Sequence, residues 1–263
     1  MSNTSSHLAA GLAPRERFAD KVVVVTGASR GIGESIGLAF ANEGANVIAI
    51  ARSAMDQPKL TPVNFDFANA NQKQIRELVD EIIAKHGRID VLVNNAGIIR
   101  RAPAVDFSEQ DWDDVLRVNL SSPFFLTQAV AKWWLDKGRA ASPNDSRLKI
   151  VNIASLLSFQ GGITVPAYAA SKHGIAGITK ALANEWAKER INVNAIAPGY
   201  ISTDNTRALR ENPTRNQAIK DRIPQGDWGQ PHDISGAVLF LASHDADYVN
   251  GAILNIDGGW LAR

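Results

Sequence analysis

The sequence predicts an α/β protein in which a doubly wound parallel sheet of seven strands forms a single domain. Short apolar runs alternate with amphipathic helical stretches along the whole chain, which is the pattern of a parallel sheet covered on both faces. The 263 residues, 45% of them hydrophobic, are enough for one large core. No segment rich in Pro, Gly or Ser divides the chain into two domains.

The expected strands are continuous apolar runs, because a strand of a covered parallel sheet is buried on both faces. Six of them can be placed by residue, at 21–27, 46–51, 89–97, 147–155, 191–199 and 251–257. Helices are predicted between them, at 33–44, 72–87, 109–138, 168–189 and 233–243. Gly44 and Gly87 end the first two helices.

Three segments fall outside this alternation. Residues 1–19 are expected to be a flexible tail ahead of a domain at 20–263. Residues 138–147, "GRAASPNDSR", resemble a surface loop in composition. Residues 200–230 are the least regular part of the chain, and we interpret them as a lid over a site.

Composition excludes several classes of function. A net charge of +1 gives no reason to expect nucleic acid or an acidic membrane surface as a partner. The chain has no cysteine, which excludes disulfides and thiolate metal sites, and we predict no metal. No apolar run reaches the roughly 18 residues of a membrane span. The N-terminus lacks the pattern of a signal peptide, so we expect a cytoplasmic protein.

The stretch "TGASRGIG", residues 26–33, follows the first predicted strand and opens the first helix. Gly27, Gly31 and Gly33 allow a tight turn and a close approach to a ligand. The start of the helix offers free N–H groups and a positive dipole end to a pyrophosphate. The position of this motif in an alternating chain predicts a Rossmann-type dinucleotide site.

A second group of residues suits hydride chemistry. Tyr168 and Lys172 are four residues apart, so they share one face of a helix. Ser155 ends a predicted strand, and Asn119 lies in the preceding long helix. Oxidation of an alcohol requires a base, and a free tyrosine has a pKa near 10. We expect the Lys172 ammonium and the nicotinamide ring to lower the pKa of Tyr168, while Ser155 holds the substrate oxygen.

These motifs, with "NNAG" at 94–97 and Pro198–Gly199, resemble the short-chain dehydrogenase/reductase family over residues 18–263. The resemblance implies that Tyr168 is the acid/base, that Ser155 orients the substrate, that Lys172 holds the nicotinamide ribose and that Asn119 anchors a relay water. It also implies that Ile201 and Thr203 contact the nicotinamide amide and that Asp66 faces the adenine amine. The full predicted cofactor set is Gly27, Ser29, Arg30, Gly31, Ile32, Gly33, Arg52, Asp66, Phe67, Asn95, Ala96, Gly97, Tyr168, Lys172, Pro198, Gly199, Ile201 and Thr203.

The choice between NAD and NADP depends on the end of the second strand. The sequence there is Ala51–Arg52 with no acid, and Arg30 stands beside the glycine turn. Basic residues at these positions favour the 2′-phosphate of NADP, although Arg52 can also stack on adenine and Arg30 can be solvated. Segments such as "NNAGIIRR" and "DGGWLAR" further resemble dehydrogenases of 2-keto-3-deoxy sugar acids and deoxygluconates, which mostly use NAD. The expectation is NAD(P), with NAD slightly ahead.

A sugar acid needs a cation for its carboxylate. Arg100 and Arg101 follow the strand that ends beside the nicotinamide, and we expect one of them to face inward. The alternative is that both pair with surface acids such as Asp106 or Glu109. Gln160, Tyr200 and Asn205 are further substrate candidates, and Trp260 and Arg263 are expected to reach a neighbouring subunit's site.

Bulky residues including Trp133, Trp134 and Trp186 on two helices predict a homotetramer, unless these tryptophans are all core. Two other functions share the same motifs. A 3-oxoacyl-[acyl-carrier-protein] reductase would carry a basic docking patch, which is not evident here. A non-catalytic binding protein on this fold would tolerate loss of Tyr168 or Lys172, yet both are present.

Overall fold

A computed structural model describes residues 16–142 and 146–263. Seven parallel strands form one sheet in the order β3-β2-β1-β4-β5-β6-β7. They are β1 (Val22–Thr26), β2 (Asn46–Ala51), β3 (Thr61–Asn64), β4 (Val91–Asn94), β5 (Leu148–Ile153), β6 (Ile191–Pro198) and β7 (Ile253–Ile256). The predicted doubly wound sheet is confirmed. The strand not placed from the sequence is β3, whose residues "TPVN" alternate between half-buried and exposed and form no apolar run.

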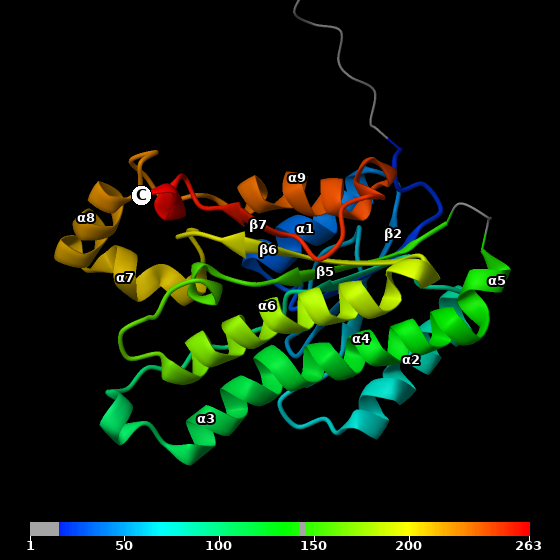
Figure 1. Ribbon diagram of the computed structural model, residues 1–263, viewed down its shortest axis with the longest axis horizontal. Helices are drawn as coiled ribbons and strands as arrows, with labels where there is room; N and C mark the ends of the chain where they lie inside the picture. The colour runs from blue at the N-terminus through cyan, green and yellow to red at the C-terminus, as the bar shows by residue number, and fades with distance from the viewer. Residues whose placement is uncertain (1–15, 143–145) are drawn as a thin grey trace, which may run out of the picture.

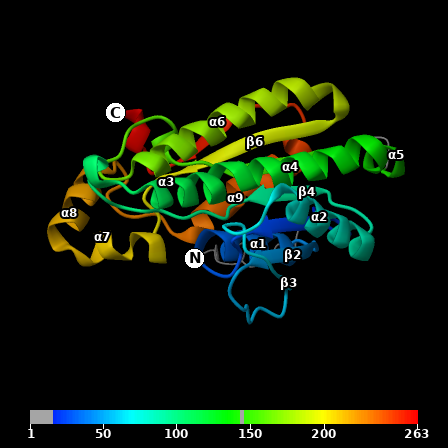
Figure 2. The ribbon, with the colours of Figure 1, turned by 90° about the horizontal axis from the view of Figure 1, so that it is seen from below.

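Two layers of helices cover the sheet (Figure 1). One face packs against α2 (Gln72–His86), α4 (Ser122–Trp133) and α6 (Pro166–Trp186), through a core that includes Ile75, Leu126 and Leu182. The other face packs against α1 (Gly31–Asn42) and α9 (Pro231–Ala242), with Phe40 and Val238 in that core. Figure 2 shows α4 and α6 running side by side below the sheet. No helix in the described ranges is long and apolar enough to cross a membrane.

The long helical stretch predicted at 109–138 is divided. It consists of α3 (Glu109–Leu116), the π-helical turn η2 (Arg117–Ser121), α4, a second π-helical turn η3 (Trp134–Gly138) and α5 (Arg139–Ala141). The helix therefore extends into the segment predicted as a loop at 138–147, and residues 143–145 lie outside the described ranges. Short 3₁₀ turns complete the chain, at η1 (Ala104–Asp106), η4 (Leu156–Ser158), η5 (Ala187–Glu189), η6 (Asp204–Thr206), η7 (His244–Ala246) and η8 (Trp260–Ala262).

The predicted tail ends earlier than residue 19. Residues 1–15 lie outside the described ranges, but Phe18 is only 2% exposed and packs edge-on against Phe40, with ring centroids 4.8 Å apart. Arg17 also pairs with Glu43. An aromatic side chain this well buried belongs to the core, so the domain includes residues 16–19.

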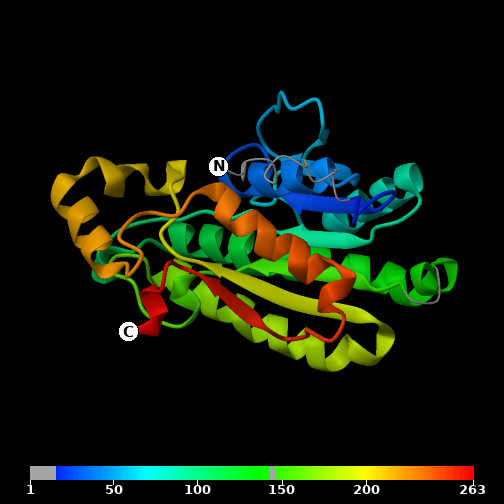
Figure 3. The same ribbon diagram turned by 90° about the horizontal axis from the view of Figure 1, so that it is seen from above.

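The segment 200–230 is mostly helical, contrary to its irregular sequence. It contains η6, α7 (Arg207–Glu211) and α8 (Pro213–Arg222), which lie beyond the carboxyl ends of the strands (Figures 1 and 3). A small apolar cluster joins α8 to the C-terminal turn η8 and to η4; its buried members are Leu156, Ile219, Ile223, Trp228 and Trp260. The helical segment is therefore anchored to the sheet domain at its far end.

Strands β2 and β3 lie on one side of β1. The chain then crosses to the other side of β1, where β4 pairs with it. Two loops therefore leave the sheet in opposite directions above the carboxyl ends of β1 and β4. Such a reversal of strand order creates the crevice in which open α/β sheets bind ligands.

Candidate active site

A cleft of about 630 Å³ opens at this crevice. Every residue predicted to bind the cofactor lines it, from the glycine turn after β1 to Pro198, Gly199, Ile201 and Thr203 after β6. Ser155, Tyr168 and Lys172 line the same cleft. The structure thus gathers residues that follow each of the strands β1 to β6, with two from the start of α6, into one continuous site.

The glycine turn is shaped for close backbone approach. Gly27 and Gly31 have φ of +66° and +60°, which side chains rarely tolerate. A Cβ on Gly33 would lie 2.2 Å from the Gly27 carbonyl oxygen, so helix α1 packs too tightly there for any other residue. The N-cap of α1, Arg30, makes no capping bond with its side chain, which leaves the first N–H groups of the helix for a phosphate.

Asn95 braces this turn from the end of β4. Its side-chain amide donates to the carbonyls of Thr26 and Gly27, at 2.9 and 3.1 Å. Its backbone N–H and that of Ala96 donate to the Thr26 hydroxyl, at 3.0 and 2.9 Å. Asn95 lines the cofactor cleft as predicted, and it also fixes the loops of β1 and β4 to each other.

Tyr168 lies in the first turn of α6, with its hydroxyl near Ser155 and Arg101. Burial raises the pKa of the Tyr168 phenol above its usual value, while a hydrogen bond with Ser155 and the positive charge of Arg101 act to lower it. We had expected Lys172 to be the residue that lowers this pKa. In the structure burial dominates, and the opposing charge comes from Arg101.

Lys172 lies one turn further along α6 and is 5% exposed. Its ammonium donates a hydrogen bond to the Ile153 carbonyl at the end of β5, at 2.7 Å. Burial lowers the pKa of Lys172 to about 8. The side chain therefore ties α6 to the central sheet. Because of its burial, the ammonium also loses its proton at a lower pH than a free lysine does.

Asn119 lies in the π-helical turn η2 and is 1% exposed. Its carboxamide oxygen accepts the Ile98 N–H at 2.8 Å, and its nitrogen donates to the Ile98 carbonyl and the Ser171 hydroxyl, at 2.9 and 3.2 Å. A π turn at a functional site is common, because the extra residue redirects a side chain. Here it turns Asn119 toward the loop after β4, behind the cleft rather than on its wall.

The two adjacent arginines have different surroundings. Arg100 lines the cleft, but its guanidinium pairs with Asp111 at 3.1 Å and with Asp114 at 4.0 Å. These acids are on α3 and are not the ones we named as alternatives. Arg101 is exposed, and within the described ranges it forms no ion pair, while its charge acts on Tyr168.

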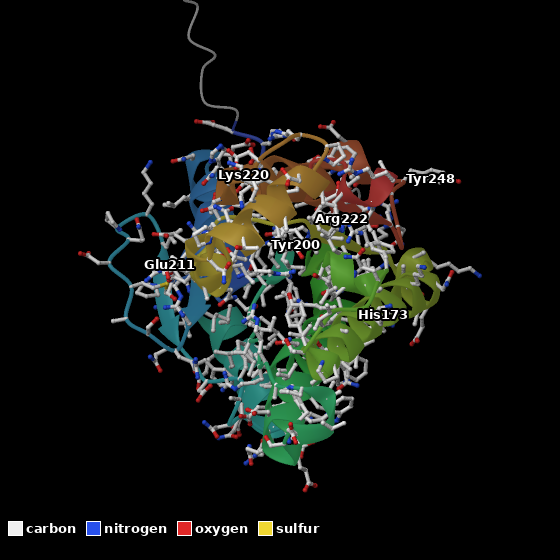
Figure 4. The ribbon with its side chains drawn as sticks, turned by 90° about the vertical axis from the view of Figure 1, so that its left-hand side faces the viewer. His173, Tyr200, Glu211, Lys220, Arg222 and Tyr248 are labelled. Carbon is white, nitrogen blue, oxygen red and sulfur yellow. The ribbon has the colours of Figure 1, made fainter. Side chains whose placement is uncertain are left out.

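The three weaker substrate candidates, Gln160, Tyr200 and Asn205, have different surroundings in the structure. Asn205 lines the cleft. Gln160 accepts a hydrogen bond from the Trp260 indole at 3.3 Å. The ring of Tyr200 packs against Trp228 and Trp260, at centroid distances of 5.3 and 4.7 Å. Figure 4 shows Tyr200 near the middle of this end of the molecule, between the helices that carry Glu211 and His173.

The C-terminal turn packs against α8 of the same chain. Trp260 is 4% exposed, and the Arg222 guanidinium stacks over its ring at 4.0 Å. Arg263 donates to the Asp221 carbonyl at the end of α8, at 2.9 Å. Both residues therefore hold α8 in place within this chain.

The opposite end of the cleft is basic. Arg52 and Arg30 both line it, with loose ion pairs to Asp66 at 4.0 Å and to Asp204 at 3.6 Å. Asp66 is otherwise engaged locally, accepting from the Ala68 N–H and the Asn69 side chain, at 3.1 and 2.7 Å. This end of the cleft therefore offers a bound ligand two cations, Arg52 after β2 and Arg30 in the turn after β1.

Sequence reasoning missed several wall residues, which are Ser53, Phe65, Ala68, Asn69, Ile98, Gln110, Asp114 and Val118. Most flank β3 or lie on α3, where no motif marks them. A signal was present only for Asn69, a short polar residue in the turn after Asp66. No group of three or more His, Asp or Glu side chains in the described ranges is suited to a metal ion.

Together these features fit a dinucleotide: an uncapped helix start beside a glycine turn, a long cleft, and a lysine, serine and tyrosine at the far end. A family model described as enoyl-(acyl carrier protein) reductase matches residues 27–261. The chain belongs to the short-chain dehydrogenase/reductase family. It is an NAD(P)-dependent oxidoreductase that acts on CH–OH groups.

Three relatives show where the chain lies in that family. It is 48% identical to 2-dehydro-3-deoxy-D-gluconate 5-dehydrogenase of Escherichia coli K12, over 92% of this chain and 96% of that protein. A dehydrogenase structure from Agrobacterium tumefaciens with bound NADP is 51% identical, with a TM-score of 0.82 over 95% of this chain and 100% of that one. A gluconate 5-dehydrogenase of Burkholderia cenocepacia in complex with NADP and tartrate is 35% identical, with a TM-score of 0.85 over 95% and 98%.

Proposed function

We propose that this enzyme oxidises a secondary hydroxyl of a 2-keto-3-deoxy sugar acid, or reduces the corresponding ketone. The observation that carries the proposal is Arg101, an exposed guanidinium whose positive charge acts on Tyr168 and which has no ion-pair partner in the described ranges. A planar guanidinium suits a carboxylate because it donates two parallel hydrogen bonds. The E. coli relative acts on an acid of this kind, and the Burkholderia relative holds tartrate, a hydroxy acid.

In the proposed reaction Tyr168 is the acid/base. Ser155, which hydrogen-bonds the Tyr168 side chain, holds the substrate oxygen near that hydroxyl. Lys172 fixes the face of α6 that carries Tyr168, through its bond to Ile153. The bound nicotinamide supplies the hydride acceptor or donor. Asn119 holds the loop after β4, on which Arg101 lies, through its two bonds with Ile98.

The proposal is tested by replacing each arginine with alanine. The assay compares 2-dehydro-3-deoxy-D-gluconate with its carboxamide, which has the same shape and no charge. Arg101→Ala should lower kcat/KM for the acid, and the decrease should correspond to a loss of about 1.5–3 kcal/mol in transition-state stabilisation. The kcat/KM for the carboxamide should change little. Arg100→Ala should keep the preference for the acid, because Arg100 is paired with Asp111 and Asp114. If Arg101→Ala keeps the wild-type preference, the carboxylate is held elsewhere.

For the cofactor we propose NADP, in place of the slight NAD preference that the family resemblance implied. Two arginines face the adenosine end of the cleft in loose ion pairs, and Asp66 is occupied by its own turn. Both solved relatives described above contain NADP. Arg52→Ala should weaken NADP binding by about tenfold and NAD binding by much less, measured by fluorescence titration of the reduced cofactors. Equal losses for both cofactors would argue against a 2′-phosphate contact.

An acyl-carrier-protein reductase is the second candidate, and the description of the matching family model favours it. That reaction has an acyl chain as substrate and needs no cation for a substrate carboxylate. Measuring NADPH oxidation with acetoacetyl-coenzyme A, beside the sugar acid assay, separates the two functions. Faster turnover of the thioester would replace our proposal.

We also propose that the enzyme is a homotetramer. The tryptophans that predicted this assembly from the sequence pack in the chain's own core, so the proposal depends on other exposed residues. Trp134 is 1% exposed, and Trp133 and Trp186 pack against the same core. The exposed apolar side chains instead include Phe240 on α9 and Leu254 on β7, whose outer edge is unpaired within the described sheet. Tyr248, which is fully exposed, projects from the same side of the molecule (Figure 4). Light scattering at micromolar concentration should give four times the 28.4 kDa chain mass, and a monomer mass would refute the proposal.

The cytoplasm is the expected location, because a chain without cysteine needs no oxidising compartment. Fractionation of the source cells, with immunodetection of the chain, would test this expectation. Recovery with the membrane or secreted fraction would contradict it.

A further inference from the structure

Thr164 has an unusual backbone conformation close to the active site. Its φ is +64°, in the left-handed region that a β-branched residue avoids. Such strain costs free energy and persists where the surrounding structure imposes it, most often at functional sites. The Thr164 hydroxyl donates to the Ile163 carbonyl at 2.6 Å, which compensates part of the cost locally.

The conformation has a specific consequence. The Thr164 carbonyl accepts a hydrogen bond from the backbone N–H of Ala102, at 3.1 Å. Ala102 is the residue after Arg101, and Thr164 lies four residues before Tyr168. One hydrogen bond therefore joins the loop that carries the substrate-side cation to the segment that leads into the helix of the acid/base.

Gly162 and the buried Val165 pack against this segment's surroundings, but the residues on either side of Gly162 are open. Ile163 is 85% exposed, and Gly161 has no atoms within 4 Å of the position a Cβ would take. Pro166 at the start of α6 keeps Val165 out of the helical region, so the chain must change direction within two residues. The strain at Thr164 could in principle serve only this change of direction. The bond to Ala102 shows that it also orients a carbonyl toward the arginine loop.

We propose that Thr164 is a positioning residue: its left-handed backbone presents the carbonyl that fixes Ala102 and so keeps Arg101 beside Tyr168. This inference goes beyond the carboxylate role given to Arg101 under the proposed function. It concerns the placement of the guanidinium and holds whether or not the substrate is a sugar acid.

The consequence can be measured through Tyr168. The groups that act on its hydroxyl are Ser155 after β5 and Arg101 after β4, and Lys172 lies on its own helix. Oxidation needs Tyr168 as a base, so the acidic limb of the pH–rate profile for oxidation reports its pKa. Since the positive charge of Arg101 acts to lower the pKa of Tyr168, Arg101→Ala should move this limb to higher pH. If Thr164 works through Arg101, its substitution should move the same limb in the same direction.

The test is a double-mutant cycle with the uncharged carboxamide as substrate. Thr164→Val keeps the side-chain shape but removes the hydroxyl that supports the left-handed conformation. It should shift the limb to higher pH and, like Arg101→Ala, change kcat/KM for the carboxamide little at the pH optimum, because it acts through Arg101. In the Arg101→Ala background it should cause no further shift. Additive shifts, or an unchanged limb in Thr164→Val, would overturn the proposal.

Two further variants separate positioning from folding. Thr164→Asn should retain the wild-type profile, because asparagine tolerates the left-handed region. Asp20→Val places the same side chain at another left-handed position, φ +61°, ahead of β1 and remote from the site. It should lower the melting temperature without moving the limb. If Thr164→Val does not fold, hydrogen exchange of the wild-type protein replaces it. The Ala102 amide, bonded to the Thr164 carbonyl, should exchange with deuterium at least about tenfold more slowly than in an unfolded chain, and unprotected exchange would overturn the proposal.

The same data distinguish this inference from the proposed function. If Arg101→Ala moves the limb but does not change the preference for acid over carboxamide, the sugar-acid role of Arg101 fails and the positioning role stands. If Arg101→Ala removes the preference and Thr164→Val acts additively, the positioning role fails alone.

Discussion

The ammonium nitrogen of Lys172 lies over the ring of Tyr168, 5.5 Å from its centroid, and donates its hydrogen bond to the Ile153 carbonyl. The two side chains share one face of α6 as their four-residue spacing requires. Their pKa values are shifted apart by the same cause, since burial raises that of Tyr168 above its usual value and lowers that of Lys172 to about 8.

The first prediction concerns the acid/base. Tyr168→Phe removes only the hydroxyl and should reduce kcat by about 10²–10⁴-fold, the usual contribution of such a group. Cofactor affinity should change little, because the glycine turn is at the other end of the cleft. Stopped-flow turnover and fluorescence titration check the two parts. Tyr248→Phe, at a fully exposed tyrosine, serves as the matched control and should keep wild-type turnover.

The second prediction concerns stability against pH. The pKa of Lys172 is about 8 in the folded protein and near 10.5 in the unfolded chain, so the unfolded state binds more protons between these values. The free energy of unfolding should therefore rise by about 3 kcal/mol, relative to Lys172→Met, as the pH rises from about 8 to about 10.5. Urea denaturation of both proteins across this range measures the difference. A difference that is constant with pH would show that Lys172 does not titrate abnormally.

The third prediction concerns a buried cation on the opposite end of the sheet. Lys149 is 4% exposed and its ammonium bonds Asp247 at 2.6 Å. Asp247→Ala should destabilise the fold by about 2 kcal/mol, less than for a fully buried pair because the carboxylate side chain is one-third exposed. Adding Lys149→Met should restore much of that loss, since no charge is then left buried without a partner. Equal instability of the single and double variants would mean that the pair itself contributes little.

The fourth prediction concerns the tryptophans of the long helix. Trp134 is 1% exposed, and its indole donates to the Glu189 carbonyl at 2.9 Å. Trp134→Ala should cost about 3–5 kcal/mol of unfolding free energy, as expected for a large buried side chain. Trp112→Ala, at a tryptophan 38% exposed on α3, should cost much less. Calorimetry compares the two. Similar losses would indicate that Trp112 is also buried, in an oligomer.

The sequence by itself determined the sheet, the glycine turn after β1 and the shared helix face of Tyr168 and Lys172. Buried parallel strands require apolar runs, a pyrophosphate turn requires glycines, and two side chains four apart on a helix must share a face. Such features depend on local geometry, which a sequence pattern records directly. β3 was missed because, as an edge strand of half-buried residues, it carries no such pattern.

Only the tertiary structure decided what surrounds the charged groups. It paired Arg100 with Asp111 and Asp114, left Arg101 without an ion-pair partner in the described ranges, and placed Trp134 and Trp260 inside the chain's own cores. The left-handed conformation of Thr164 and its bond to Ala102 join residues 62 positions apart. Ion pairing, burial and pKa depend on atoms that come together from distant parts of the chain, and neighbouring letters do not contain that information.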